Sequence, residues 1–386
     1  MDYDRKIDHI QRQMPALQNC IYFNIGWASP MPVPVDEAIR GQAQRELTLG
    51  RVGPAATAAR EDAMARARAA VARVIGASPE EIALTFSATE AMNIVVWGLD
   101  WQEGDELIST NLENPAGLMP LYMVRERKGV KLHLVDLHYG EVDAVEAIAA
   151  AITPRTRLIM FSEVTYSTGA LLPVRRIVEL AHENDILVLV DAAQSCGAIP
   201  VKVHENGADF YAISGHKWLC GPEGTGALYA RRDRWETIAP TYVGVYSDLQ
   251  HGLGGGLNLQ PNARRFEGST RNYPNLIGQE AGILWLEGEV GFPWAMECIA
   301  GLIHRARQLL GGVKNLSILT PPEAGGLLSF AIAGIDAEDL DSKLAQQRIF
   351  TRWVDEPRCV RISLGFYNTE EELERLTEVL QVLARR

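Results

Sequence analysis

The middle of the chain alternates between short apolar segments and longer helical segments. Several of the short segments are apolar on both faces, which is typical of strands buried in a parallel sheet. They are Ile82–Phe86, Glu106–Ser109, Lys131–Val135, Arg157–Phe161, Ile186–Val190, Phe210–Ile213 and Gly226–Tyr229. Helical segments separate the earlier ones, at about 89–98, 115–128, 142–152 and 173–184. This alternation predicts an α/β fold in which helices flank a mostly parallel central sheet.

Beyond Tyr229 the alternation becomes less regular. The segment 246–265 is rich in glycine, asparagine and glutamine, so we expect a mobile loop there. Helices and strands then follow in an order typical of an α+β unit. We therefore expect a large domain over residues 21–274 and a smaller domain built from residues 1–20 and 275–386.

Composition and charge exclude several classes of partner. The 49 acidic residues outnumber the 37 basic ones, which gives a net charge of -12. Such a chain is poorly suited to binding nucleic acid or an anionic membrane, so we expect neither partner. The N-terminal residues have no apolar segment of the secretory type, and no apolar run is long enough to span a membrane. The histidines lack the spacing of metal ligands, so we expect no metal site.

The cysteines favour a reducing compartment. Their number is odd and they include no C-x-x-C pair, which argues against a disulfide framework and against a structural zinc site. They are Cys20, Cys196, Cys220, Cys298 and Cys359. We therefore expect a cytoplasmic protein. One of these cysteines could still act as a nucleophile.

A lysine directly after a buried strand is the strongest chemical signal. Lys217 stands in the sequence Ser-Gly-His-Lys-Trp, and a glycine-rich turn follows at 221–226. Partial burial lowers the pKa of an amine and favours a Schiff base with an aldehyde. Taken alone, the motif is equally typical of a surface loop.

Two further features change that balance. Asp191 ends a central apolar strand, where α/β folds bind ligands, and a carboxylate there can keep a pyridinium nitrogen protonated. Small and hydroxylated residues from Ser87 to Ala91 begin a helix, whose free N–H groups attract a phosphate. The alternative for both is helix capping, with Ser87 and Glu90 forming a capping box. Lysine, acid and anion site together indicate pyridoxal 5'-phosphate.

With these residues the sequence resembles the fold-type I pyridoxal-phosphate enzymes of the class V aminotransferase and cysteine desulfurase family, from Tyr22 to the C-terminus. The resemblance implies a large domain with a mostly parallel sheet and a smaller α+β C-terminal domain. It further implies that Lys217 binds the cofactor covalently, that Asp191 pairs with its pyridine nitrogen, and that Gln194 bonds its phenolic oxygen. The residues that would hold the phosphate are Ala88, Thr89, Ser214 and His216.

The resemblance also implies a dimer and an amino-acid substrate. Thr270 matches a residue that reaches the phosphate of the neighbouring subunit, so we expect a homodimer with shared active sites. Arg361 matches the arginine that binds the substrate carboxylate, and Arg352 is a second candidate whose alternative is an exposed strand-end cation. Gly26 and Trp27 lie in a segment that lines the substrate site in relatives.

Three positions depart from the family pattern. Asn114 follows Glu113 where a histidine usually stacks on the pyridine ring, and Tyr166 stands where many relatives carry asparagine. Tyr166 would either bond the cofactor oxygen or form the pocket wall. Desulfurases carry a persulfide-forming cysteine on a mobile loop after the arginine that Arg352 resembles, but here that loop is short and Pro357 occupies the position. Cys359 is expected on a strand, where it cannot swing toward a substrate.

The strongest likeness is to the L-cyst(e)ine C-S lyases, in segments 96–101, 240–244 and 265–267. We therefore expect β-elimination on cysteine, cystine or a related S-substituted amino acid. The products would be pyruvate, ammonia and a sulfur compound, with no persulfide on the enzyme. A class V aminotransferase or an amino-acid epimerase would use the same lysine and stays an alternative. A sulfur-relay protein is a further alternative, which would need a mobile cysteine.

Overall fold

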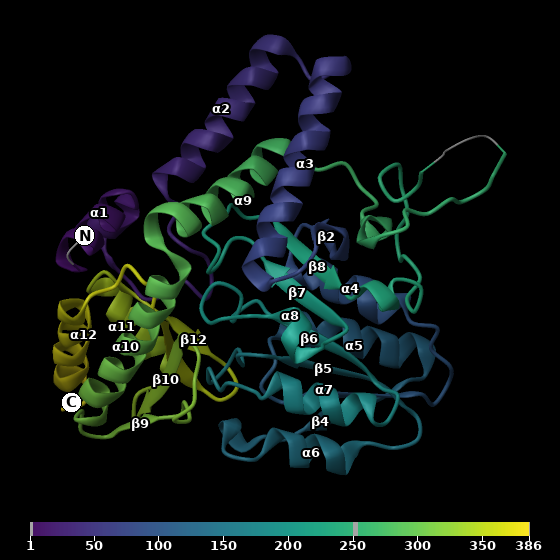
Figure 1. Cartoon of the computed structure of the whole chain (residues 1–386). Helices are drawn as coiled ribbons and strands as arrows, with labels where there is room; N and C mark the ends of the chain where they lie inside the picture. Colours follow the sequence, from purple (N-terminus) through teal and green to yellow (C-terminus); the bar gives the residue numbers. More distant parts are fainter. Residues whose placement is uncertain (1–2, 250–253, 386) are drawn as a thin grey trace.

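The larger sheet confirms the predicted α/β architecture. The computed structural model describes residues 3–249 and 254–385, and within them this sheet has seven strands in the order β2-β8-β7-β6-β5-β3-β4 (Figure 1). β8 runs antiparallel to both of its neighbours, β2 and β7, and the other neighbouring strands of this sheet are parallel. The strands are β2 (Ile82–Thr85), β3 (Glu106–Thr110), β4 (Lys131–Val135), β5 (Thr156–Ser162), β6 (Leu187–Asp191), β7 (Phe210–Ser214) and β8 (Gly226–Ala230).

Helices cover both faces of this sheet. They include α3 (Pro54–Ile75), α4 (Ala88–Gly98), α5 (Pro115–Lys128), α6 (Ala144–Ala151), α7 (Val174–His182) and the short α8 (Val203–Asn206). Successive residues of a strand enter different cores, because side chains alternate between faces. On β6, Val188 and Val190 pack with residues of α6 and α7, whereas Leu189 packs with residues of α4 and α5. The next residue on the α4–α5 face is Asp191, which this alternation turns toward α4 and α5.

A second, antiparallel sheet has the order β12-β13-β10-β9. Figure 1 shows it beside the larger sheet, together with α10, α11 and α12. Its elements are α10 (Phe292–Gly311), β9 (Leu316–Ile318), β10 (Leu327–Ile332), α11 (Ala337–Gln346), β12 (Arg352–Val354), β13 (Cys359–Ser363) and α12 (Glu370–Leu383). Their apolar faces share one core. The division into two domains at residue 274 stays a prediction.

The N-terminal residues join the two sheets. β1 (Ile21–Tyr22) pairs in parallel with β11 (Ile349–Phe350), and Asn24 forms a bridge with Ser363 of β13. α1 (Tyr3–Arg12) and α2 (Val33–Leu49) were not predicted. Val35 is the only residue of α2 that is buried, so its sequence carries little apolar periodicity. α2 and α3 both pack on α9 (Tyr273–Trp285), which continues as a π-helical segment, Leu286–Val290.

The segment expected to be a mobile loop is partly paired. Leu249 donates its N–H to Asn258 O at 2.7 Å, and Gln260 donates to Ser247 O at 2.9 Å. A 3-10 turn, Ala263–Phe266, follows. Residues 250–253 of the expected loop lie outside the described residues, and its mobility stays a prediction. Along the described chain, no helix combines the length and the apolar character that a membrane span requires.

A buried ion pair fixes the end of this segment to the larger sheet. The Arg68 guanidinium of α3 lies 2.7 Å from Glu267 Oε1, which also accepts the N–H of Leu84 at 2.9 Å. We predict that Glu267→Gln lowers the free energy of unfolding by about 3 kcal/mol, because it leaves the Arg68 charge buried without a counter-ion. Chemical denaturation measures this change.

The control for this prediction is an exposed ion pair of the same composition. Arg175 and Glu179 lie one helical turn apart on α7, at 2.9 Å, with both side chains largely in solvent. Glu179→Gln is expected to change the free energy of unfolding by no more than about 0.5 kcal/mol. Equal losses in the two variants would contradict the importance of the buried pair.

Candidate active site

A small cavity lies at the carboxyl ends of the parallel strands, beside the N-terminus of α4. Its volume is about 170 Å3. Most of the residues that the sequence singled out for the cofactor line it together: Ala88, Thr89, Asn114, Tyr166, Asp191, Gln194, Ser214, His216 and Lys217. The cavity has further lining residues that the sequence did not indicate: Met92, Ala116, Gly117, Ser162 and Ala193. We call this space the cofactor cavity.

Lys217 and Asp191 set the electrostatics of the cofactor cavity. Burial lowers the pKa of Lys217 to about 8, against the opposing effect of Asp191, while Arg361 and Arg352 lower it further. Burial raises the pKa of Asp191 above its ordinary value, and Lys217 opposes this. The Asp191 carboxyl accepts the N–H of Ala193 at 2.9 Å. The pair therefore supplies an amine of which an appreciable fraction is neutral near physiological pH, and a carboxyl whose charge is stabilised by a nearby cation.

The opposite end of the cavity suits an anion. α4 starts at Ala88, and its first N–H groups have no acceptor within the helix. Ser87 Oγ accepts the N–H of Glu90 at 3.1 Å, but the Glu90 carboxylate accepts from Phe86 rather than from Ser87. The predicted capping box is thus half formed. Buried His216 Nδ1 has no hydrogen-bond partner within the described chain, which leaves it for a ligand.

Gln194 is held in place from two sides. It donates to Gly26 O at 2.9 Å, and its Oε1 accepts the indole N–H of Trp218 at 3.0 Å. A Cβ atom at Gly26 would lie 2.6 Å from Ser363 Oγ and 2.9 Å from Gln194 Oε1, so this close approach requires glycine. Trp218 carried no signal in the sequence beyond its position next to Lys217.

Two arginines approach the cavity from the smaller sheet. Arg352 and Arg361 are cross-strand partners on β12 and β13. Arg361 is fully buried; it donates to Tyr166 O at 2.6 Å, and its Nε finds no partner among the described residues. Burial lowers the pKa of Arg361 to about 10. Arg352 donates to the Tyr166 hydroxyl at 3.0 Å and lies 4.0 Å from the Trp27 ring centre.

A second cavity, of about 730 Å3, adjoins the first at Tyr166, which lines both. Arg352, four aromatic rings and four acidic side chains line this second space. The aromatic and acidic residues are Trp27, Tyr122, Tyr166, Trp353, Glu113, Asp341, Asp355 and Glu356. We call it the outer cavity.

Asn114 and Thr270 are placed differently from the other predicted residues. Asn114 Oδ1 accepts the N–H of Ala116 at 2.8 Å, so it caps α5 as well as lining the cofactor cavity. Thr270 is exposed and lines neither of the two cavities of its own chain. Its expected role toward a second subunit stays a prediction. No cluster of three metal-ligating side chains occurs in residues 3–249 and 254–385.

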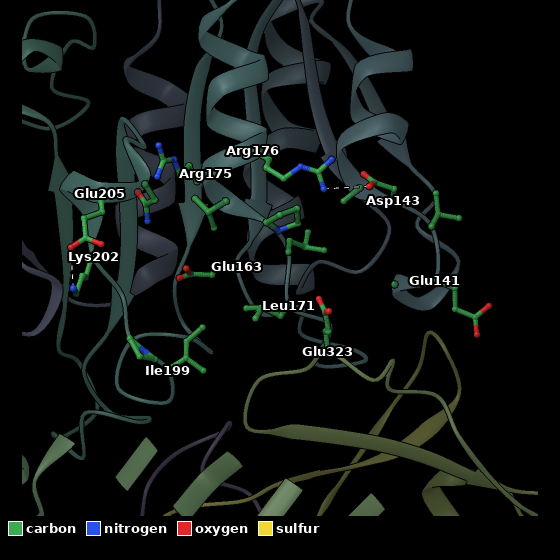
Figure 2. A pocket seen from close by; sticks show the side chains of 18 residues that line it. Glu141, Asp143, Glu163, Leu171, Arg175, Arg176, Ile199, Lys202, Glu205 and Glu323 are labelled. Atoms are coloured by element: carbon green, nitrogen blue, oxygen red, sulfur yellow. Dashed lines mark hydrogen bonds and ion pairs between the residues drawn. The ribbon is translucent and has the colours of Figure 1, made fainter. Parts of the chain in front are cut away.

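A third and larger cavity lies apart from these residues. It measures about 1020 Å3 and surrounds Glu163, between α6, α7 and the loop that carries Glu323 (Figure 2). None of the residues predicted for the active site lines it. Two pairs of its charged side chains lie within ion-pair distance: Arg176 with Asp143, and Lys202 with Glu205. The reactive groups of the chain therefore gather at the cofactor cavity instead.

The fold and the site define a pyridoxal-phosphate-dependent enzyme of fold type I. The family model for aminotransferase class-V matches residues 21–376, and the chain belongs to this family. A probable cysteine desulfurase from Methanothermobacter thermautotrophicus is 29% identical over 98% of each chain. An isopenicillin N epimerase from Streptomyces clavuligerus is 33% identical over 82% of this chain and 84% of its own.

Solved structures agree with these relatives. The cystine C-S lyase C-DES, in a complex with its reaction product cysteine persulfide, superposes with a TM-score of 0.92. It is 30% identical and covers 96% of this chain and 99% of its own. A C-DES variant with glycine covalently linked to its PLP cofactor has a TM-score of 0.91 at 29% identity. The predicted family, fold class and cofactor are thus confirmed.

The lowered pKa of Lys217 has a measurable consequence. In cofactor-free protein, we predict that an amine-modifying reagent labels Lys217 at a rate that rises with pH, reaches half its maximum near pH 8 and then levels off. The cause is the neutral amine fraction, which follows a pKa of about 8. Peptide mass spectrometry over a pH series measures it. Exposed lysines serve as the internal comparison, since an ordinary lysine amine titrates near 10.4. Parallel pH profiles for Lys217 and exposed lysines would contradict the prediction.

Proposed function

We propose that this enzyme is a C-S lyase that catalyses β-elimination on cysteine, cystine or a related S-substituted amino acid. The products are pyruvate, ammonia and a sulfur compound, and the enzyme carries no persulfide. One observation carries the proposal: Lys217 and Asp191 line the cofactor cavity and Arg352 lines the outer cavity, and among the described residues no cysteine lines either of them. The likeness to a cystine C-S lyase supports it.

The residues of the cofactor cavity fit pyridoxal 5'-phosphate. Lys217 would bind it, Asp191 would pair with its ring nitrogen, and Gln194 would bond its phenolic oxygen. The first turn of α4, with Ala88 and Thr89, would hold the phosphate together with Ser214 and the unpartnered nitrogen of His216. When bound, the cofactor supplies an electron sink for a carbanion at the substrate Cα.

Lys217 is the base of the proposed reaction. Its amine titrates near pH 8 because it is buried, so an appreciable fraction is neutral at physiological pH and can take the proton from the substrate Cα. Loss of that proton makes the Cβ–S bond labile. The sulfur leaves with the bonding electron pair, and the three-carbon remainder hydrolyses to pyruvate and ammonia. Asp191 stays ionised through the reaction if a cation faces it.

The arginines position the substrate. Arg361 is anchored to Tyr166 O through one nitrogen, and its unpartnered Nε is left for the α-carboxylate. Arg352 faces the outer cavity, where it would bind a second carboxylate at the distal end of a substrate such as cystine. Trp27 and Tyr166 hold its guanidinium between their rings, at 4.0 and 5.6 Å. Gly26 would contribute by admitting Gln194 close to the backbone.

An epimerase or an aminotransferase is the second candidate. The isopenicillin N epimerase relative favours it, since that protein shares most of the length of this chain. We also propose a homodimer in which Thr270 reaches the cofactor phosphate of the other subunit. The reducing cytoplasm is the expected compartment, because all five cysteines are free.

The lyase proposal predicts the products of a substrate panel. Purified holoenzyme given cystine, cysteine or simple amino acids is expected to form pyruvate without an added keto acid, and Lys217→Ala to lose both turnover and the visible cofactor absorbance. Pyruvate assays and spectra measure these outcomes. Turnover that requires a keto-acid acceptor would show an aminotransferase, and α-hydrogen exchange with inversion alone would show an epimerase. Full activity of Lys217→Ala would contradict the cofactor assignment.

The proposed absence of an enzyme persulfide predicts that Cys359 is dispensable. Cys359 lies on β13, two residues before Arg361, but its side chain is fully buried and burial raises its pKa to about 11. A buried thiol of this kind is a poor nucleophile. Cys359→Ala is expected to keep turnover of cystine within about threefold, whereas loss of a covalent nucleophile costs on the order of a thousandfold or more. A persulfide on Cys359 in intact-protein mass spectra would contradict the proposal.

A further inference from the structure

Among the described residues, Tyr166 alone lines both the cofactor cavity and the outer cavity. It lies in the loop that follows β5. Two hydroxyl groups from the C-terminal part of the chain hold this loop: Ser329 Oγ donates to Ser167 O at 2.6 Å, and Thr320 Oγ1 donates to Thr168 O at 2.6 Å. The backbone that carries Tyr166 is therefore fixed to the part of the chain that also carries the two arginines.

Arg352 and Arg361 are both bonded to Tyr166, through different nitrogen atoms. Arg361 donates from Nη1 to Tyr166 O at 2.6 Å, and Arg352 donates from Nε to the Tyr166 hydroxyl at 3.0 Å. Their guanidinium groups lie 4.7 and 5.6 Å from the centre of the Tyr166 ring, and Trp27 lies 4.0 Å from that of Arg352. Tyr166 thus determines which part of each guanidinium stays free for a ligand.

The free parts of the two guanidinium groups differ. A guanidinium binds a carboxylate through two parallel N–H bonds, from either its Nε–Nη2 edge or its Nη1–Nη2 edge. On Arg361 the bond from Nη1 leaves the Nε–Nη2 edge, and Nε has no partner in the described part of the chain. On Arg352 the bond from Nε, which is the one hydrogen bond of this side chain to another described residue, leaves the Nη1–Nη2 edge. Arg352 lines the outer cavity but not the cofactor cavity.

The charges of the outer cavity make the placement of Arg352 important for an anionic ligand. Arg352 is the only basic residue among the described residues that line it. Four acidic residues share the wall: Glu113, Asp341, Asp355 and Glu356. Arg358 pairs with Asp355 at 3.1 Å, which still leaves three acidic side chains facing one arginine. These carboxylates repel a carboxylate of the ligand, so such a group binds only where the free edge of Arg352 meets it.

We propose that Tyr166 is a positioning residue that holds the free edge of Arg352 toward the outer cavity, so that the enzyme selects amino acids with a carboxylate at the far end of the side chain. Cystine belongs to this class of substrate, and simple S-alkyl cysteines do not. The effect of Tyr166 on the distal carboxylate passes through Arg352. The inference rests on the proposed function, in which Arg361 binds the α-carboxylate of the substrate and Arg352 a distal one.

Two amino acids of equal chain length test the proposal in the holoenzyme. L-2-Aminosuberate ends in a carboxylate and L-2-aminooctanoate ends in a methyl group, and neither has a sulfur leaving group at Cβ. In titration calorimetry, we expect the wild type to bind aminosuberate about tenfold more tightly than aminooctanoate. Tyr166→Phe is expected to reduce this ratio to about threefold or less, because the Arg352 guanidinium loses the hydroxyl that holds it.

A double-mutant cycle separates positioning from a general structural role. Arg352→Gln is expected to abolish the preference for aminosuberate by itself. Adding Tyr166→Phe to that variant is expected to change the ratio no further, because Tyr166 acts through Arg352. The control is Tyr211→Phe, which removes a hydroxyl on β7 that accepts from Asn206 and lines neither cavity. This control is expected to keep the wild-type ratio.

Three results would overturn the proposal: no preference in the wild type, an unchanged ratio in Tyr166→Phe, or the same loss from Tyr166→Phe with and without Arg352. If Tyr166→Phe does not fold, Arg352→Lys tests the same contact. Lysine keeps the charge but has no fork to anchor and present, so the preference is expected to fall by about threefold or more, and an unchanged preference would also overturn the proposal. Neither ligand undergoes elimination, so a failed lyase assignment is recognised separately by the pyruvate assays.

Discussion

The active site depends on burying an amine next to a carboxyl group. Asp191 ends β6, Lys217 follows the end of the adjacent parallel strand β7, and both side chains line the cofactor cavity. Burial disfavours charge on each of them, and only their proximity to one another, or a ligand of suitable charge, offsets this cost. A cofactor with a cationic ring nitrogen and an aldehyde satisfies both groups at once. At the opposite end of the cavity, the free N–H groups of α4 and the imidazole of His216 are polar groups without partners, and the phosphate of such a cofactor would supply them.

Much of the fold could be predicted from the sequence, because the strands of the larger sheet are buried on both faces. β3, β5, β6 and β7 lie within one or two residues of their predicted bounds. The predicted cofactor residues also meet in one cavity, since strand ends and helix starts are local features. α2 was missed because a helix that buries one residue has no apolar periodicity. Its position depends on packing against α9, which local sequence does not reveal.

The contacts that hold the site together were less accessible to sequence reasoning. The indole of Trp218 fixes Gln194 across 24 positions, and Tyr166 joins both arginines through its carbonyl and its hydroxyl. Such contacts depend on the tertiary structure, so they cannot be predicted from the type of residue at one position of the sequence. Glu113 shows the same limit: a glutamate before a helix resembles an ordinary polar residue in the sequence, and only its burial in the structure shows that its pKa is raised to about 7.

The pairing of β1 with β11 has a consequence for the order in which the molecule is built. Residues 87–217 supply the cofactor cavity, so its whole lining is synthesised in the first part of translation. The substrate side is different, because Gly26 and Trp27 are held by strands that contain Ile349, Phe350 and Ser363. Contacts across more than 300 residues form only after nearly all of the polypeptide has left the ribosome. A nascent chain therefore has the residues to hold the cofactor well before it has those proposed to hold an amino acid, so the proposed reaction has to wait until synthesis is nearly finished.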